Sequence, residues 1–386
     1  MKKILIVDDE VQIIKALSRM FLDTDYEIIP AESGRDALKL LEDAPVDMII
    51  CDMRMPEMDG YKLLTIIKEK YPKVIRIILS GYADEKPMYR ALLHNVANLY
   101  VFKPWNNTEF LHRVEKLFAI DSILHADALA NRIKDLECSS CIPENCERMI
   151  SLIEKEDTET LITLIEQDPD ISRLLIQVAK SAVYGVMPNK VKQAALYMGL
   201  SNLKCFVHWA CIASANKQTD DIEADPEILW RHSYLTNRIF LFFYEAFLHK
   251  QPAESMMFAG LIHNIGLIIL ADRLKKKGVL KNINLTPNEY IDLVYGEYEE
   301  LHQEIGAYLL EQWDLPFPMY EVALYHHRPL DPGIIFRELV SVVHIAGTYA
   351  WKALGATNYR PVKEEVFEQL EVSLEDFEKR LTRYLK

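Results

Sequence analysis

The chain has 386 residues, half of them hydrophobic, so it is long enough for two or three domains with sizeable cores. Its formal net charge of −14 opposes binding to a phosphate backbone, so we do not expect nucleic acid as a partner. Its apolar runs fall short of the roughly 20 residues of a membrane span, and acids follow only four apolar residues after the start, unlike a signal peptide. We therefore expect a cytoplasmic protein without membrane insertion. Its six cysteines are then thiols, metal ligands or redox groups rather than structural disulfides.

Short apolar runs alternate with stretches of helical spacing in the first 118 residues. The spacing predicts strands over residues 4–7, 27–31, 47–52, 74–80 and 98–102. Five such β-α units predict an α/β fold, a doubly wound parallel sheet with helices on both faces.

Polar residues stand where these strands end. Asp8 and Asp9 follow the first strand, Asp52 ends the third, Ser80 ends the fourth and Lys103 ends the fifth. The carboxyl ends of parallel strands share one edge, so these side chains should converge. Three carboxylates at one point repel each other unless a cation such as Mg²⁺ neutralises them, and a carboxylate beside that ion can attack a phosphoryl group.

The motifs around these residues resemble the receiver domain of two-component response regulators. They are VDDE at 7–10, CDMRMPEMDG at 51–60, LSGYAD at 79–84 and FKPW at 102–105. The resemblance covers the first 118 residues and implies a sensor histidine kinase as phosphodonor and Asp52 as phosphoacceptor. It also implies Mg²⁺ on Asp8, Asp9 and Asp52, and switch roles for Ser80, Tyr100 and Lys103.

Helical spacing continues from Thr108 to about Glu137, which is longer than the closing helix of a receiver requires. This stretch could transmit a signal as one rigid helix or could start the formation of a dimer. The segment CSSCIPENC then brings Cys138, Cys141 and Cys146. C-x-x-C is a common zinc or redox spacing, but no second pair follows, so we favour packed or exposed thiols.

Helix-start signals dominate beyond Glu147 and predict an all-helical body of about a dozen helices. A capping residue precedes a proline at Asp168, Asp225 and Thr286. Residues 361–386 read as two short charged helices, with a capping box at Ser373, and we favour a solvated amphipathic end over packing or partner binding.

The motifs of this body resemble the HDOD domain, a subgroup of the HD superfamily, over about residues 136–352. They include LIEQDPDISRLLIQVAKSAVYG at 164–185, LWRHSYLTN at 229–237, AGLIHNIG at 259–266, LHQEIGAYLLEQWDLP at 301–316, YHHRP at 325–329 and VVHIAG at 342–347.

By position, His232 matches the first histidine of the HD site, His263 and Asn264 match its histidine-aspartate pair, and Gly347 matches its closing aspartate. Both carboxylates are therefore missing, although a catalytic HD site needs carboxylates and imidazoles together. Three more histidines stand at places similar to the family's, namely His302, His326 and His327. They could bind a metal without catalysis, but we favour hydrogen-bonded core residues and do not expect a metal there.

These resemblances imply a receiver at 1–121, a helical linker at 122–137, an HDOD domain at 138–352 and a C-terminal extension at 353–386. The expected function is that of a response regulator whose non-catalytic HDOD module binds a downstream signalling protein. The alternatives are a metal-dependent phosphodiesterase acting on a cyclic dinucleotide, and a body that binds a nucleotide as effector. Receivers often pair through their fourth and fifth helices, so a homodimer is a further alternative.

Overall fold

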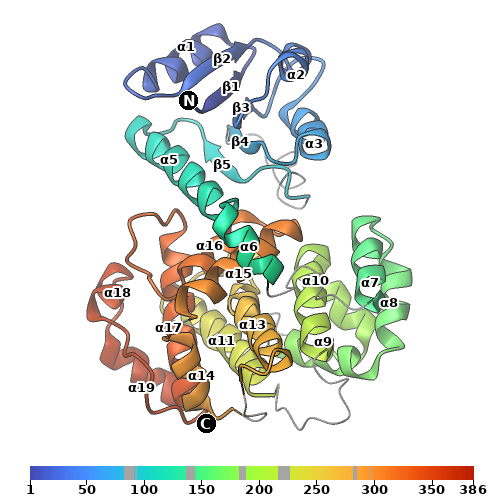
Figure 1. Ribbon diagram of the computed structural model, residues 1–386, viewed down its shortest axis with the longest axis vertical. Coiled ribbons are helices and arrows are strands. Elements are labelled where there is room, and N and C mark those ends of the chain that lie inside the picture. Colours follow the sequence, from blue (N-terminus) through green and yellow to red (C-terminus); the bar gives the residue numbers. More distant parts are fainter. Residues whose placement is uncertain are drawn as a thin grey trace. The chain divides into compact units, whose positions relative to one another are not determined.

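The computed structural model describes residues 1–81, 91, 94–135, 144–181, 188–215, 227–280, 285–296 and 298–386. The chain divides into two compact units, Met1–Asp121 and Ser122–Lys386, and the boundary falls within helix α5 (Asn107–Leu124). The first unit is the α/β part of Figure 1, and the second is its all-helical part.

The first unit is built on a five-stranded parallel sheet of order β2-β1-β3-β4-β5. The strands are β1 (Lys3–Val7), β2 (Glu27–Ala31), β3 (Met48–Asp52), β4 (Ile75–Ser80) and β5 (Leu99–Phe102). Each lies within one residue of the predicted bounds, and the predicted doubly wound α/β fold is confirmed. β3 and β4 are buried along their whole length, which explains their near-continuous apolar sequence.

Helices cover both faces of this sheet. They are α1 (Val11–Met20), α2 (Gly34–Asp43), α3 (Gly60–Lys70) and α5. In Figure 1, α1 and α5 lie on one side of the sheet, and α2 and α3 lie on the other. Side-chain caps fix two of the starts, because Ser33 accepts a hydrogen bond from the amide of Asp36 and Asp59 accepts one from the amide of Lys62.

The second unit is entirely helical over its described residues, as predicted. Its α-helices are α6 (Asp127–Asp135), α7 (Glu144–Glu154), α8 (Thr158–Glu166), α9 (Pro169–Ser181), α10 (Val191–Ala215), α11 (Glu227–Ala246), α12 (Ala259–Ile262), α13 (Ile265–Lys276), α14 (Pro287–Val294), α15 (Glu299–Gln312), α16 (Phe317–Tyr325), α17 (Arg337–Ala353), α18 (Glu364–Gln369) and α19 (Leu374–Tyr384). A short 3₁₀ turn, Glu254–Met256, precedes α12.

Two of the three predicted capped starts are confirmed. Asp168 accepts hydrogen bonds from two amides in the first turn of α9, and Thr286 forms a capping box with Glu289 at the start of α14. Asp225 lies outside the described residues.

The long helical stretch after Thr108 is two helices rather than one rod, because α5 ends at Leu124 and α6 begins at Asp127. The break lets Leu129 and Ile133 of α6 become buried, each about 3% exposed. Periodicity alone missed it because both helices carry the same apolar spacing.

The C-terminal helices pack on the helical body, so the expectation of a solvated end was wrong. Phe377 of α19 is fully buried, and its ring centroid lies 5.4 Å from that of Phe243 on α11 and 5.0 Å from that of Tyr349 on α17. The apolar face that could have met solvent or a partner is thus part of the core.

Cysteine pairing also differs from the expectation. Cys146 of α7 and Cys211 of α10 form a disulfide, with their Cα atoms 5.8 Å apart and both side chains buried. The packing of α7 against α10 brings together two residues that are 65 positions apart in the sequence. Cys138 and Cys141 lie outside the described residues, and Cys51 and Cys205 are buried free thiols.

Among the described residues, one stretch is long and apolar enough to cross a membrane, Glu254–Lys276 with mean hydropathy 1.5. Within the protein, 83% of that window is buried. This stretch contains α12 and α13, which are buried helices of the second unit.

Candidate functional site

The strand ends of the first unit bring together the acidic residues, Ser80 and Lys103. In the sheet, Val7 lies beside Cys51, Asp52 beside Leu79, and Ser80 beside Phe102, so β1, β3, β4 and β5 end at nearly the same level. The amide of Lys103 donates a hydrogen bond to the carbonyl oxygen of Ser80 at 2.8 Å. This bond holds Lys103 beside the end of β4, on the edge where the acidic residues lie.

Lys103 joins two of the carboxylates. Its Nζ lies 2.5 Å from Oδ1 of Asp52 and 3.1 Å from Oδ2 of Asp8. Asp8 is 1% exposed and Asp52 is 7% exposed, whereas Asp9 is exposed to solvent. One ammonium group thus joins two buried carboxyl groups at one edge of the sheet.

Two more contacts fix the buried carboxylates. The amide of Arg54 donates to Oδ2 of Asp52 at 2.8 Å, and the amide of Glu10 donates to Oδ1 of Asp8 at 2.8 Å. Gly60, at the start of α3, packs so closely under Asp52 that a Cβ atom there would overlap the Asp52 carbonyl oxygen. Only glycine permits this approach.

The pKa values of the central pair reflect burial and mutual attraction. Burial raises the pKa of the Asp52 carboxyl group, and the hydrogen bond from Lys103 opposes this shift. For Lys103, burial lowers the pKa, but the hydrogen bond to Asp52 and the charges of Asp52 and Asp8 outweigh burial, so the pKa is raised. A divalent cation suits this site, because the buried carboxylates remain in excess over the one lysine and offer the oxygen ligands that Mg²⁺ prefers.

Ser80 and Tyr100 flank this centre. The Ser80 side chain is fully buried, and its hydroxyl donates to the carbonyl oxygen of Gly81 at 3.3 Å. The Tyr100 hydroxyl donates to the carbonyl oxygen of Ala91 at 2.7 Å, so its half-buried ring is turned inward.

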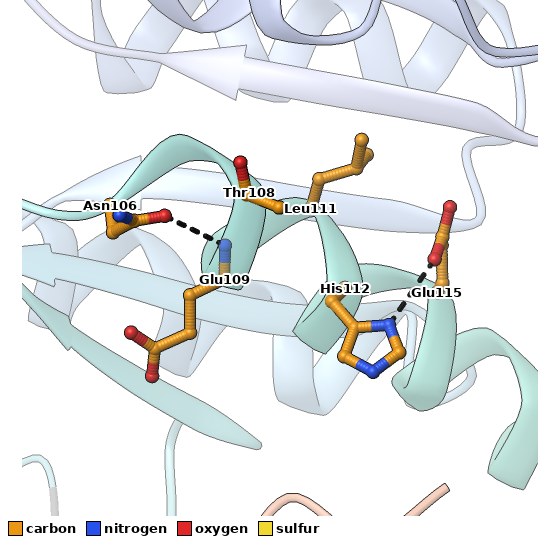
Figure 2. Close-up of a pocket in the computed structure, with 6 residues that line it drawn as sticks. All are labelled: Asn106, Thr108, Glu109, Leu111, His112 and Glu115. Carbon is orange, nitrogen blue, oxygen red and sulfur yellow. Dashed lines mark hydrogen bonds and ion pairs between the residues drawn. The ribbon is translucent and has the colours of Figure 1, made fainter. Parts of the chain in front are cut away.

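A surface pocket that does not include Asp8, Asp52 or Lys103 lies along α5 (Figure 2). Its lining residues are Asn106, Thr108, Glu109, Leu111, His112 and Glu115. In Figure 2, Asn106 caps the helix by accepting from the Glu109 amide, and His112 reaches toward Glu115 on the next turn. These are local helix contacts, and we assign the pocket no chemistry.

The second unit gathers histidines from several helices. His232 lies on α11, His263 and Asn264 form the junction of α12 and α13, and His302 lies on α15. The remaining two, His326 and His327, follow α16 directly.

Their rings form a contiguous chain through the core. The centroid of His263 lies 5.5 Å from that of His232 and 5.0 Å from that of His326. His326 in turn lies 4.0 Å from His327 and 5.5 Å from His302. All five predicted histidines therefore belong to one cluster.

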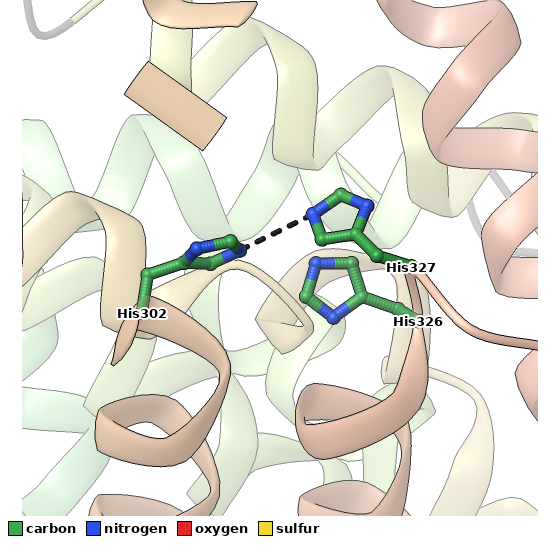
Figure 3. A group of neighbouring side chains, drawn as sticks. All are labelled: His302, His326 and His327. Atoms are coloured by element: carbon green, nitrogen blue, oxygen red, sulfur yellow. Dashed lines mark hydrogen bonds between the residues drawn. The ribbon is translucent and has the colours of Figure 1, made fainter. Parts of the chain in front are cut away.

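Three members of the chain come closest, His302, His326 and His327, and Figure 3 shows their rings facing one another from two elements. Their nearest ring nitrogens all lie within 4.8 Å of one another. Nε2 of His302 is 3.2 Å from Nε2 of His327. These three residues are the ones in the described part of the second unit that could hold a metal ion.

The two positions where the HD family has carboxylates, Asn264 and Gly347, lie at the His232–His263 end of the row of histidines. Asn264 is 2% exposed, and neither its Oδ1 nor its Nδ2 has a hydrogen-bond partner. A Cβ atom on Gly347 would lie 3.5 Å from Nε2 of His263 and 4.0 Å from Cε1 of His232, which is ordinary contact. A side chain at position 347 would therefore point toward His263 and His232. Because the residue is glycine, no carboxylate reaches these histidines from α17.

Burial holds these imidazoles neutral. It lowers the pKa of His232 to about 3 and that of His302 to about 4. Burial also places the pKa values of His263, His326 and His327 well below the usual range, and neighbouring histidines lower them further.

Sequence reasoning missed two residues that hold this chain in place. Nδ1 of His344 donates to the carbonyl oxygen of His326 at 2.7 Å, and the Trp351 ring stacks on His232 with centroids 4.0 Å apart. Both lie on α17 with Gly347, at helical spacings of three and four residues. That spacing within one amphipathic helix was the available signal.

Comparison with known families finds two domains in the chain. The model of the response regulator receiver domain matches residues 4–115, and the model of the HDOD domain matches residues 140–329.

Curated relatives match mainly through the first unit. The hydrogenase transcriptional regulatory protein HoxA of Cupriavidus necator is 35% identical over 102 residues, which are 26% of this chain and 21% of that protein. An uncharacterized protein of Treponema pallidum is 23% identical over 300 residues, 75% of this chain and 55% of that protein. The chain spans less than two thirds of the length of these curated relatives.

Two solved structures each cover about a third of this chain. The signal receiver domain of an HD domain-containing protein from Pseudomonas fluorescens Pf-5 is 31% identical, covering 31% of this chain and 96% of that chain with a TM-score of 0.30. The response regulator TrrA of Thermotoga maritima, solved in complex with Mg²⁺-BeF, is 33% identical, covering 30% of this chain and 99% of that chain with a TM-score of 0.28.

Proposed function

Because this chain belongs to the response regulators, with a receiver domain followed by an HDOD domain, we propose that a phosphoryl group on Asp52 controls which protein the HDOD domain binds. The observation that carries the proposal is the contact of Lys103 with both Asp52 and Asp8 at the carboxyl edge of the sheet. Receiver domains take phosphate from sensor histidine kinases and generally bind Mg²⁺. The proposed site of action is the cytoplasm.

Asp52 is the group we propose as nucleophile. One of its carboxylate oxygens attacks the phosphorus of a phosphohistidine, so that a P–O bond forms while the P–N bond breaks and its electron pair returns to the imidazole. Asp8, Asp9 and Asp52 would hold Mg²⁺, and the ion would neutralise charge on the transferred group. Lys103 pairs with a phosphoryl oxygen after transfer, in place of its contact with Asp52.

Ser80 and Tyr100 are the residues that we propose respond to the added charge of the phosphoryl group. The Ser80 hydroxyl can turn from the carbonyl oxygen of Gly81 toward a phosphoryl oxygen. That movement would favour a different position of the Tyr100 ring, whose hydroxyl donates to Ala91 in the structure described. A charge added at one point then shifts a population between two receiver states.

The HDOD domain is, in this proposal, a binding module for a downstream signalling protein. Asn264 and Gly347 leave the histidine chain without the carboxylates that bridge metals and activate water, so we propose no catalytic metal pair there. The phosphodiesterase alternative has a direct test: incubation of the full-length protein with cyclic di-GMP and Mn²⁺ or Fe²⁺. We expect no turnover, and linear product formation above a metal-only blank would contradict this.

Hydrogen exchange of the full-length protein with and without beryllofluoride and Mg²⁺ tests the proposal. We expect slower exchange around Asp52 and changed exchange in the HDOD domain, and Asp52→Asn should show neither. Changes confined to the receiver would contradict signalling to the HDOD domain, and an equal response in Asp52→Asn would contradict Asp52 as the acceptor.

A further inference from the structure

A stripe of partly exposed side chains runs along one face of α11. Trp230, Tyr234, Arg238 and Phe242 are spaced four residues apart, so the helix places them on the same face. Each of the four is partly exposed, as is Tyr384, the last residue of α19. We call these five residues the aromatic stripe.

Ring contacts make the aromatic stripe continuous. The rings of Trp230 and Tyr234 stack with their centroids 5.4 Å apart, and those of Phe242 and Tyr384 stack at 4.3 Å. The guanidinium of Arg238 joins the two pairs, because its Cζ lies 6.0 Å from the Tyr234 centroid and 5.2 Å from the Tyr384 centroid. Two aromatic faces therefore hold the planar group of Arg238 in place.

Arg238 differs from the other arginines that lie over aromatic rings. Among the described residues these are Arg328, Arg360 and Arg380, and each of them also pairs with an acid. No acid within the described parts of the chain pairs with Arg238. Its hydrogen-bond donors are thus oriented by the rings and available to a carboxylate from outside.

The sequence around the aromatic stripe is basic. Residues 230–238 and 379–384 contain five basic residues and no acidic one, in a chain whose net charge is −14. Arg231 and Arg383 are exposed, and neither forms an ion pair with another described residue. Charge complementarity therefore favours an acidic occupant.

The composition and length of the stripe suit a short peptide segment. Trp, Tyr and Arg are the residue types that most often dominate binding energy at protein interfaces. A carboxylate can accept two parallel hydrogen bonds from one guanidinium. From Trp230 to Phe242 the helix rises about 18 Å, a distance that an extended segment of about six residues covers.

We infer that the aromatic stripe is the docking surface for a short acidic segment of the downstream signalling protein. A carboxylate of that segment pairs with Arg238, and a neighbouring aromatic or apolar side chain packs on the rings. The inference rests on the proposed function, because it names the surface through which the second unit binds its partner. Tyr384 lies beyond the match to the HDOD model, which ends at residue 329, so the C-terminal extension completes the surface.

Single-stranded nucleic acid is the competing occupant, since its bases also stack on aromatic rings. Each nucleotide adds a negative charge, and the net charge of −14 opposes a strand of many phosphates. A segment with a few carboxylates meets less repulsion, because salt screens charges more than about 8 Å away. The test includes both occupants.

Fluorescence anisotropy with the full-length protein tests the inference. The probes are labelled peptides in which aspartates flank one Trp, Tyr, Phe or Leu, matched peptides with asparagine in place of aspartate, and a single-stranded DNA oligonucleotide. We expect an aspartate peptide to bind with a Kd below about 1 mM, at least about tenfold more tightly than its asparagine match. Failure of all the aspartate peptides, equal binding of the asparagine peptides, or tighter binding of the oligonucleotide would overturn the inference.

Variants locate the site. Arg238→Gln should lower peptide affinity at least about tenfold. Arg238→Lys keeps the charge but loses the planar group, so it should recover only part of that loss. Arg360→Gln is the matched control, because Arg360 lies 4.2 Å from the centroid of Tyr295 but is paired with Glu299 at 3.0 Å. It should bind like wild type. Unchanged affinity in either Arg238 variant, with folding checked by circular dichroism, would overturn the inference.

The result is separable from the proposed function. The same titration is run with and without beryllofluoride and Mg²⁺. Peptide binding that depends on Arg238 but ignores beryllofluoride would support the docking surface and contradict control by Asp52. Absence of peptide binding, with hydrogen exchange in the HDOD domain still responding to beryllofluoride, would overturn the docking surface alone.

Discussion

Gly60 and Asp52 are packed backbone to backbone, with no room for a methyl group on Gly60 beside the Asp52 carbonyl oxygen. The amide of Gly60 also donates to the carbonyl oxygen of Met53 at 2.9 Å, which ties the start of α3 to the end of β3. The acceptor aspartate is therefore positioned by a helix start as much as by its own strand.

Gly60→Ala should destabilise the receiver by about 1–3 kcal/mol, because the overlap forces α3 away from β3. The displaced Asp52 should also bind beryllofluoride more weakly. Urea unfolding and a beryllofluoride titration measure the two effects. Gly347→Ala is a control in the other unit, because an added Cβ atom there would make only ordinary van der Waals contacts. Equal stability of Gly60→Ala and wild type would contradict the packing argument.

His208 should make the protein less stable in acid. Burial lowers its pKa to about 4, against an ordinary value of 6.5 in the unfolded chain. The unfolded chain thus binds the proton first as pH falls, so the stabilisation is complete above about pH 6.5 and is lost progressively down to about pH 4. The loss amounts to at most about 3 kcal/mol.

Urea unfolding at several values in that pH window measures the slope. His208→Gln should show a shallower dependence on pH than wild type, although other buried histidines such as His344 still contribute in the same direction. Parallel curves for the two proteins would contradict the assignment to His208.

Reduction of the Cys146–Cys211 disulfide should lower stability by up to about 4 kcal/mol, since the bond closes a 65-residue loop. Thermal unfolding with and without reductant measures the change. The double variant Cys146→Ala/Cys211→Ala should be insensitive to reductant. Cys205→Ala, which removes a buried free thiol on the same α10, should keep the sensitivity. A wild type that unfolds identically in both conditions would contradict the prediction.

Asn264→Asp should place an unpaired charge in the core, because the amide it replaces is buried and has no partner. We expect a loss on the order of 3 kcal/mol in the presence of a chelator. Added Mn²⁺ or Zn²⁺ should recover more stability in this variant than in wild type, because the new carboxylate lies in the histidine chain. Melting temperatures with and without metal measure this, and a metal-independent deficit would contradict it.

Sequence reasoning worked where local pattern and topology agree. The apolar run Met48–Cys51 can only be a buried strand in an alternating β-α chain, and a parallel sheet then sends Asp52 to the same edge as Asp8. The direct contact of both with Lys103 follows from that edge.

Sequence reasoning failed where the answer depends on which helices meet. Nothing local to Cys146 reveals Cys211, since their pairing needs α7 to pack on α10. The positions of His302 and His327 in the sequence likewise do not give the 3.2 Å between their nitrogens. An amphipathic helix such as α19 fits solvent, a partner or the core equally well until its neighbours are known.

The burial of α19 also defines what can be cut from the chain. Its Phe377 contacts Phe243 on α11, Phe247 just after α11 and Tyr349 on α17. The helices α11 and α17 also carry His232 and Gly347. A fragment ending near residue 352 would expose those aromatic rings to solvent, and the resulting apolar surface would promote self-association. The last 34 residues therefore belong to any piece of this protein that is to be expressed, crystallised or used as bait.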